Sequence, residues 1–155
     1  MGYGKHLVFI SYETSGGLPY ADEAKSIFGA AGYKTWVWHH DRKSGAYTAE
    51  EIEQNIRHCR HFVYICTKGS DDSYGQRYER CTAWAYAKPF VILAFDPAYV
   101  SPMLTAYNHN PVSPENLGAE CRRLAREMRT QERDQQQLDT PVARYLRENE
   151  PLESA

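Results

Sequence analysis

The sequence predicts an α/β protein in which helices cover both faces of a central, mostly parallel sheet of four to five strands. Apolar runs rich in β-branched and aromatic residues alternate along the chain with segments that carry helix signals. Most of these runs are apolar nearly throughout, as buried parallel strands are. The 155 residues suit one domain with a single core.

Four apolar runs are predicted to form strands, at 6–12, 33–38, 62–66 and 90–95. They are short and bounded by polar or turn-forming residues, which favours strands over buried helices. The segment 96–112 holds three prolines and no clear strand pattern, although a short fifth strand at the sheet edge would fit there.

Helix signals place helices between and after these strands, at 21–31, 48–58, 73–87 and 113–128. Pro19 precedes the first helix and Gly32 ends it. Thr48 and Ser73 each begin a capping box, in which a hydroxyl caps the helix and a Glu or Gln follows three residues later. Alternation with short connections requires right-handed crossovers and is typical of a flavodoxin-like three-layer fold.

Residues 1–129 are therefore predicted to form the domain, and 130–155 a polar C-terminal extension. Three glutamines stand between charges in this extension, and Thr140-Pro141 offers a start for a short helix at 142–147.

Charge and composition disfavour several functional classes. The formal net charge is −2, and the basic residues are scattered among acidic ones, so nucleic acid is not an expected partner. The first apolar run is too short for a secretory signal and no stretch reaches the length of a membrane span, which predicts a cytoplasmic protein without membrane contact. The four cysteines form no C-x-x-C pair and are interpreted as reduced structural residues.

A ligand-binding or active site is expected at the carboxyl ends of the strands, in the loops 13–18, 39–47 and 67–73 and from 96 onward. Two groups resemble a metal cluster, His39-His40-Asp41 and His58-Cys59-His61. The first group follows a strand whereas the second precedes one, so a strand length of roughly 15 to 20 Å separates them and no metal site is predicted. Phosphate-loop and dinucleotide-binding glycine motifs are absent from the sequence.

The order and spacing of several pieces over residues 6–129 resemble the TIR (Toll/interleukin-1 receptor) domain family. The pieces are Phe9-Ile10-Ser11-Tyr12 ending the first strand, Gly32-Tyr33, Trp38, Gly45 followed by Glu51-Ile52 and Ile56, Val63-Tyr64-Ile65, and Ser73 with Glu79 six residues later. The first domain is accordingly interpreted as TIR-like. Within this family the chain resembles the stand-alone, Thoeris-like microbial TIR proteins of antiphage defence that cleave NAD.

This resemblance implies a catalytic role for Glu79, which matches the glutamate that TIR enzymes carry early in the helix after the third strand. In those enzymes an aromatic residue often precedes the glutamate by four positions, where this chain has Gly75. Cleavage of NAD needs no general acid, because nicotinamide leaves from a cation, and a carboxylate near the ribosyl centre stabilises the developing positive charge. Without the resemblance, Glu79 would be interpreted as a partly exposed helix residue.

The resemblance also implies NAD as the substrate, no separate cofactor, and a cleft completed by self-association of TIR domains. A nucleotide product, ADP-ribose or a cyclic isomer, would then act on a downstream effector. The residues expected to bind substrate lie in or directly beside the loops 13–18, 39–47 and 67–73: Tyr12, Glu13, Thr14, Trp38, His40, Asp41, Lys43, Ser73 and Tyr74. Gly45 is expected to adopt a positive φ in the second of them.

Two other functions fit the same pattern. The chain could be a non-enzymatic TIR adaptor that assembles through the loop 39–47. It could also resemble nucleoside deoxyribosyltransferases, which share the fold and likewise use a glutamate.

Overall fold

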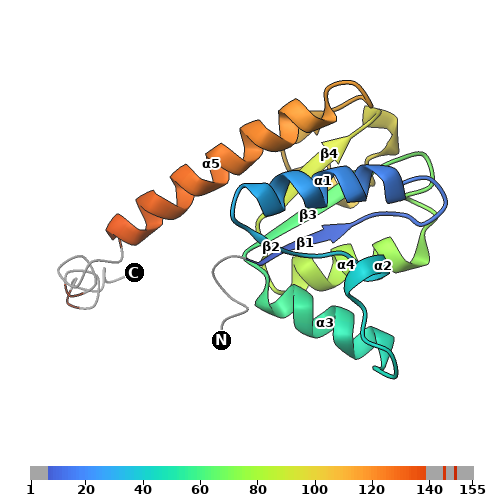
Figure 1. Cartoon of the computed structure of the whole chain (residues 1–155), viewed down its shortest axis with the longest axis horizontal. Helices are drawn as coiled ribbons and strands as arrows, with labels where there is room; N and C mark the ends of the chain where they lie inside the picture. Colours follow the sequence, from blue (N-terminus) through green and yellow to red (C-terminus); the bar gives the residue numbers. More distant parts are fainter. Residues whose placement is uncertain (1–6, 139–144, 146–148, 150–155) are drawn as a thin grey trace, which may run out of the picture. The chain divides into compact units, whose positions relative to one another are not determined.

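The structure, a computed structural model, describes residues 7–138, 145 and 149. Its sheet has five strands, all parallel, in the order β2-β1-β3-β4-β5 (Figure 1). The strands are β1 (Leu7–Ser11), β2 (Lys34–Trp36), β3 (His61–Cys66), β4 (Phe90–Ala94) and β5 (His109–Pro111). The predicted fold class is confirmed, and the fifth strand lies at the sheet edge, within the segment where it was expected to fit.

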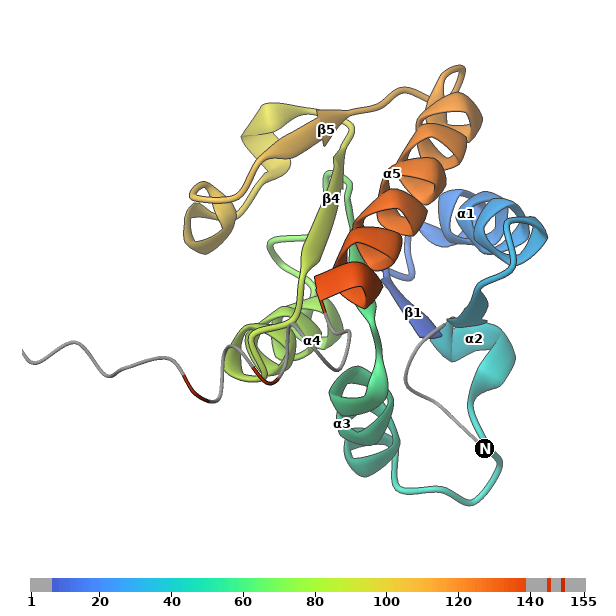
Figure 2. The same ribbon diagram turned by 90° about the vertical axis from the view of Figure 1, so that its left-hand side faces the viewer.

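Helices lie on both sides of this sheet. They are α1 (Leu18–Ala30), α2 (Trp38–Asp41), α3 (Thr48–His58), α4 (Tyr74–Ala85) and α5 (Leu117–Leu138), with 3₁₀ turns at Pro97–Tyr99 and Pro102–Leu104. Figure 2 shows α1 on one side of the strands and α3 and α4 on the other. No helix in the described part of the chain is long and apolar enough to cross a membrane.

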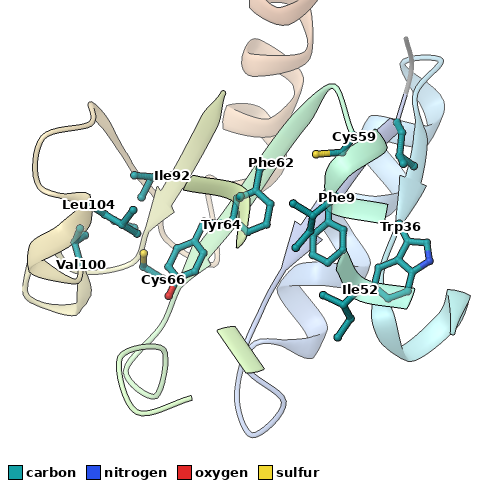
Figure 3. Packing of buried hydrophobic residues seen from close by; sticks show 14 residues of the cluster. Phe9, Trp36, Ile52, Cys59, Phe62, Tyr64, Cys66, Ile92, Val100 and Leu104 are labelled. Carbon is teal, nitrogen blue, oxygen red and sulfur yellow. The ribbon is translucent and has the colours of Figure 1, made fainter. Parts of the chain in front are cut away.

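The core between the sheet and helices α3 and α4 is built around stacked aromatic rings. Phe9 on β1 stacks against Trp36 on β2 and Phe62 on β3, with ring centroids 5.0 and 5.5 Å apart (Figure 3). Phe62 in turn stacks with Tyr64 two residues along β3, because alternate residues of a strand face the same side. This rigid layer fixes the strand ends from which the loops emerge.

Two predictions about the loop after β2 are wrong. The strand ends at Trp36 instead of Trp38, because the backbone N–H of Val37 donates to the Asp41 carboxylate (2.7 Å) and the chain turns into α2. Thr48 is the first residue of α3 and not its cap, since Tyr47 occupies the cap position without a side-chain hydrogen bond.

The last helix differs from its prediction at both ends. Ser113 and Asn116 exchange hydrogen bonds between their side chains and backbone N–H groups, so the helix begins only at Leu117. It continues to Leu138, which leaves the predicted boundary between 129 and 130 inside α5. The chain forms two compact units, Met1–Arg122 and Arg123–Ala155. The helix expected at 142–147 lies outside the described residues except for Tyr145.

Candidate active site around Glu79

Glu79 is buried at the carboxyl edge of the sheet. Ser73 caps α4 by accepting a hydrogen bond from the Gln76 backbone N–H (3.1 Å), as predicted, and this sets the rotation of the helix. Gln76 and Glu79, three residues apart, then lie on the same buried face of α4. The Glu79 side chain meets Ser11, the last residue of β1, whose hydroxyl donates to Oε1 at 2.7 Å.

The burial of Glu79 dominates its electrostatics. Only 7% of the residue is exposed, and loss of hydration raises the pKa of the carboxyl from 4.5 to about 8, while the Ser11 hydrogen bond acts in the opposite direction. None of the ion pairs among the described residues involves Glu79. The sheet edge therefore holds a carboxyl group whose proton is removed near neutral to slightly alkaline pH.

The charge of Glu79 contributes to the raised pKa values of two buried tyrosines, whose main cause is burial. Burial raises the pKa of Tyr64 to about 12 against the opposing effect of Arg80, whose guanidinium donates to the Tyr64 hydroxyl at 3.2 Å. Burial also raises the pKa of Tyr12 above its ordinary value, with smaller contributions from the charges of Glu79 and Asp22. The surroundings of Glu79 are thus aromatic and poor in water.

Glu13 is buried and its carboxylate is engaged by the protein itself. Oε2 accepts from the backbone N–H of Ser15 (2.9 Å) and from the Ser15 hydroxyl, while Oε1 accepts from Thr67 at 3.4 Å. A Cβ at Gly16 or Gly69 would lie within 3.0 Å of this carboxyl group, so both glycines leave room for it. Glu13 therefore ties the loop after β1 to the loop after β3, the two loops that flank Glu79.

The predicted site residues in and beside the loop 39–47 either make contacts within the protein or are exposed to solvent. His40 Nε2 lies 2.6 Å from Asp22 Oδ1 on α1. The Asp41 carboxylate accepts a hydrogen bond from the backbone N–H of Val37 and lies 3.6 Å from Lys25 Nζ, also on α1. These two side chains thus hold α2 against α1. Trp38 is half-buried and packs against the core cluster. Lys43 is exposed.

The remaining predicted residues lie around the start of α4 and the first loop. Tyr74 is 84% exposed, Thr14 is exposed, and the Ser73 hydroxyl is used as the helix cap. A Cβ at Gly75 would meet no atom within 4 Å, so this position has room for a side chain. Their contacts with a substrate stay a prediction.

Two hollows lie on the β2 side of the molecule, and Glu79 lines neither. One has a volume of about 430 Å³ and runs along β2 and α3, with Trp36 and Tyr47 in its wall. The other, about 360 Å³, is formed by the loop between α2 and α3. Gly45 in this loop has a φ of 82°, which confirms the predicted positive value. The described residues contain no group of three His, Cys, Asp or Glu side chains placed to hold a metal ion.

Several residues that shape the site were not predicted from the sequence. Ser11 was assigned only to a strand, and Arg80 occupies a buried helix position at 5% exposure, where an arginine is uncommon. Arg42 lies with its guanidinium carbon 4.4 Å from the centre of the Trp38 ring. The spacing of four residues between Trp38 and Arg42 is the one feature of the sequence that could have indicated this contact.

Comparison with known proteins agrees with the fold. Residues 8–137 match the family model of the TIR domain. The TIR domain of the Toll-related receptor TRR-2 from Hydra magnipapillata superposes with a TM-score of 0.64 at 18% identity, over 79% of this chain and 97% of that one.

A metazoan TIR-STING receptor from C. gigas, solved in complex with 2',3'-cGAMP, superposes with a TM-score of 0.66 at 15% identity. The match covers 81% of this chain but only 40% of the receptor. No curated protein matches the chain by sequence. Because the family model spans most of the sequence, the chain belongs to the TIR domain family.

Proposed function

We propose that this TIR domain cleaves the nicotinamide–ribose bond of NAD, with Glu79 as the catalytic residue. The observation that carries the proposal is a buried carboxyl group at the sheet edge where ligands of such folds bind. Among the described residues, only Ser11 donates a hydrogen bond to it, whereas the other buried carboxylate at this edge, Glu13, accepts from Ser15 and Thr67. A structural glutamate at 7% exposure would be expected to pair with a cation, and none of the ion pairs among described residues supplies one.

The chemistry needs a negative charge and little else from the protein. The bond between C1 of the ribose and the pyridinium nitrogen breaks with its electron pair going to nitrogen, so nicotinamide leaves neutral. The ribosyl centre becomes cationic, and the Glu79 carboxylate stabilises it in surroundings of low polarity. Water then bonds to C1 and releases a proton to solvent, which gives ADP-ribose. Alternatively a nitrogen of the adenine ring bonds to C1 and gives a cyclic isomer.

The raised pKa of Glu79 suits this role. The free site is largely neutral at pH 7, which lowers the cost of a buried charge in the absence of substrate. A bound nicotinamide ring carries a positive charge and favours the ionised carboxylate, so substrate binding and activation of Glu79 are coupled. In a stand-alone microbial TIR protein of antiphage defence, the nucleotide product would serve as a signal to a downstream effector.

A non-enzymatic interaction module is the second candidate, and the surface of α4 favours it. Tyr74, Tyr78 and Trp84 are 84%, 39% and 59% exposed on this helix, and exposed aromatic residues are enriched at protein interfaces. An adaptor would bind a partner through such residues and would leave NAD unchanged.

Two parallel incubations distinguish NAD cleavage, deoxyribosyl transfer and the non-enzymatic interaction module. The protein is mixed with NAD in one sample and with a deoxynucleoside plus a free base in another, and the products are resolved by chromatography. Release of nicotinamide together with ADP-ribose or a cyclic isomer supports the proposal. Base exchange on the deoxynucleoside would instead indicate a deoxyribosyltransferase, and unchanged substrates in both samples would indicate the interaction module.

Activity is expected to depend on self-association. Glu79 is almost fully covered in the single chain, so NAD gains access only when the surrounding loops move, and contacts between TIR domains would stabilise that arrangement. Turnover per protomer should therefore rise as the protein concentration is raised from nanomolar to high micromolar, or with a crowding agent. A constant specific activity over this range would contradict the expectation.

A further inference from the structure

We infer that Arg42, together with the hollow that it lines between α2 and α3, binds a phosphate group of the substrate and selects nucleotides over nucleosides. The inference rests on the proposed function, because it assigns the phosphate to the NAD that Glu79 would cleave. It concerns a residue that the sequence pattern had not singled out.

The guanidinium of Arg42 is held in place before any ligand binds. Its carbon lies 4.4 Å from the centre of the Trp38 ring, and Trp38 is itself half-buried against the aromatic core. An arginine stacked on a fixed ring loses less conformational freedom when its N–H groups bind an anion. The planar guanidinium can donate two parallel hydrogen bonds to phosphate oxygens.

The nearby carboxylates are engaged elsewhere. Asp41 accepts from the backbone N–H of Val37, Asp22 contacts His40, and Glu51 accepts from the backbone N–H of Lys43. Among the described residues, no ion pair involves the side chain of Arg42 or of Lys43. The α2–α3 loop thus presents two cations that the structure does not neutralise.

The hollow is large enough to admit a phosphate group and has polar residues in its wall. Its volume is about 360 Å³, and Arg42, Lys43 and the hydroxyl-bearing residues Ser44 and Thr48 contribute to its wall. Glu51 also lines it, but one of its oxygens is held by the Lys43 backbone at 2.9 Å. Two cationic and two hydroxyl side chains around one hollow favour an anion with several acceptor oxygens.

The proposed substrate, NAD, would connect the hollow with the Glu79 site. Burial raises the pKa of Tyr12, and the charges of Glu79 and Arg42 act on the same hydroxyl in opposite directions. In NAD the ribose that reacts at C1 carries the diphosphate on its C5. The inference assigns the diphosphate of a NAD whose ribose lies at Glu79 to Arg42.

Calorimetric titration of the full chain with ADP-ribose, inorganic pyrophosphate and adenosine tests the inference. Arg42→Gln should weaken ADP-ribose binding by at least about tenfold and leave adenosine binding unchanged, since a charge-assisted hydrogen bond is lost. Arg42→Lys should retain part of the affinity as a point charge. Added salt should weaken binding to the wild type more than to Arg42→Gln. The matched control is Arg57→Gln, which removes the same charge at the exposed far end of α3.

Equal ADP-ribose affinity in Arg42→Gln and Arg57→Gln would overturn the inference, as would wild-type protein that binds adenosine as tightly as ADP-ribose. Pyrophosphate binding as tight as that of ADP-ribose would contradict selection of a nucleotide. Kinetics separate this from the proposed function, because Arg42→Gln should raise the KM for NAD with little change in kcat. NAD cleavage unaffected by Arg42→Gln refutes the subsite alone, whereas Arg42-dependent ADP-ribose binding without any NAD cleavage refutes the proposed function alone.

Discussion

Glu79→Gln is expected to lower the rate of nicotinamide release about a hundredfold to a thousandfold, which is typical for the loss of one preorganised stabilising group. Glutamine keeps the size of the side chain and can still accept the 2.7 Å hydrogen bond from Ser11. It lacks the negative charge that would stabilise the ribosyl cation. The measurement is nicotinamide release by wild type and variant at matched concentration.

The same substitution should stabilise the fold at alkaline pH. The pKa of Glu79 is about 8 in the folded protein and near its ordinary 4.5 in the unfolded chain, so between these values only the folded state holds the proton. The stability of the wild type should therefore fall as pH rises through this window, by up to about 1.4 kcal/mol per pH unit from this group. Glu79→Gln has no such group, so its melting temperature should exceed that of the wild type at pH 9.

A matched control removes a charge without touching the site. Glu115→Gln changes an exposed glutamate before α5 and should alter neither the rate nor the pH dependence of stability. Full NAD cleavage by a folded Glu79→Gln protein would refute the catalytic assignment. A Glu79→Gln melting curve that follows the wild type at every pH would show that the carboxyl is hydrated instead of buried.

Gly45→Val should lower NAD cleavage by about tenfold or more without unfolding the core. The φ of 82° at Gly45 is costly for a β-branched residue, on the order of 1 to 3 kcal/mol, and the α2–α3 loop would adopt another conformation to relieve the strain. A Cβ at this position would meet open space, so the effect comes from the backbone and not from a clash. The measurement is cleavage rate together with a melting curve.

Two further variants isolate the backbone effect. Gly45→Asn should keep most of the activity, because asparagine tolerates a positive φ. Gly29→Val places the same side chain on α1, also in open space but without a positive φ, and should leave the rate unchanged. If Gly45→Val cleaved NAD as fast as Gly29→Val, this loop would have no part in the site.

The fold class was predictable because its signals are local. The apolar strand runs, Gly32 and the capping serine Ser73 each specify their own segment, and the parallel arrangement follows from the alternation of strands and helices. The fifth strand carries no clear pattern of its own in the sequence. The strand end at Trp36 was not predictable, because it depends on the Asp41 carboxylate folding back onto Val37. The late start of α5 similarly depends on the paired hydrogen bonds of Ser113 and Asn116.

The candidate site was predictable only where the family pattern marks a residue. Glu79 was identified from its position after Ser73, yet its burial was missed, because exposure depends on contacts with β1 across the fold. Glu13 was expected to bind substrate, and nothing in the local sequence signals that its oxygens reach Thr67, 54 residues away. Arg42 was missed because its proposed role depends on its having no acidic partner among the described residues, which a sequence does not display.

The pH dependence of kcat/KM in wild type and Ser11→Ala tests the central claim most directly, because it reports the ionisation of the free enzyme. If cleavage requires the ionised Glu79, kcat/KM should rise about tenfold per pH unit below a midpoint near 8 and level off above it. Ser11→Ala removes the hydrogen bond that lowers this pKa, so its midpoint should move to higher pH. A profile that is flat between pH 6 and 9, or a midpoint that Ser11→Ala leaves in place, would contradict the assignment of Glu79.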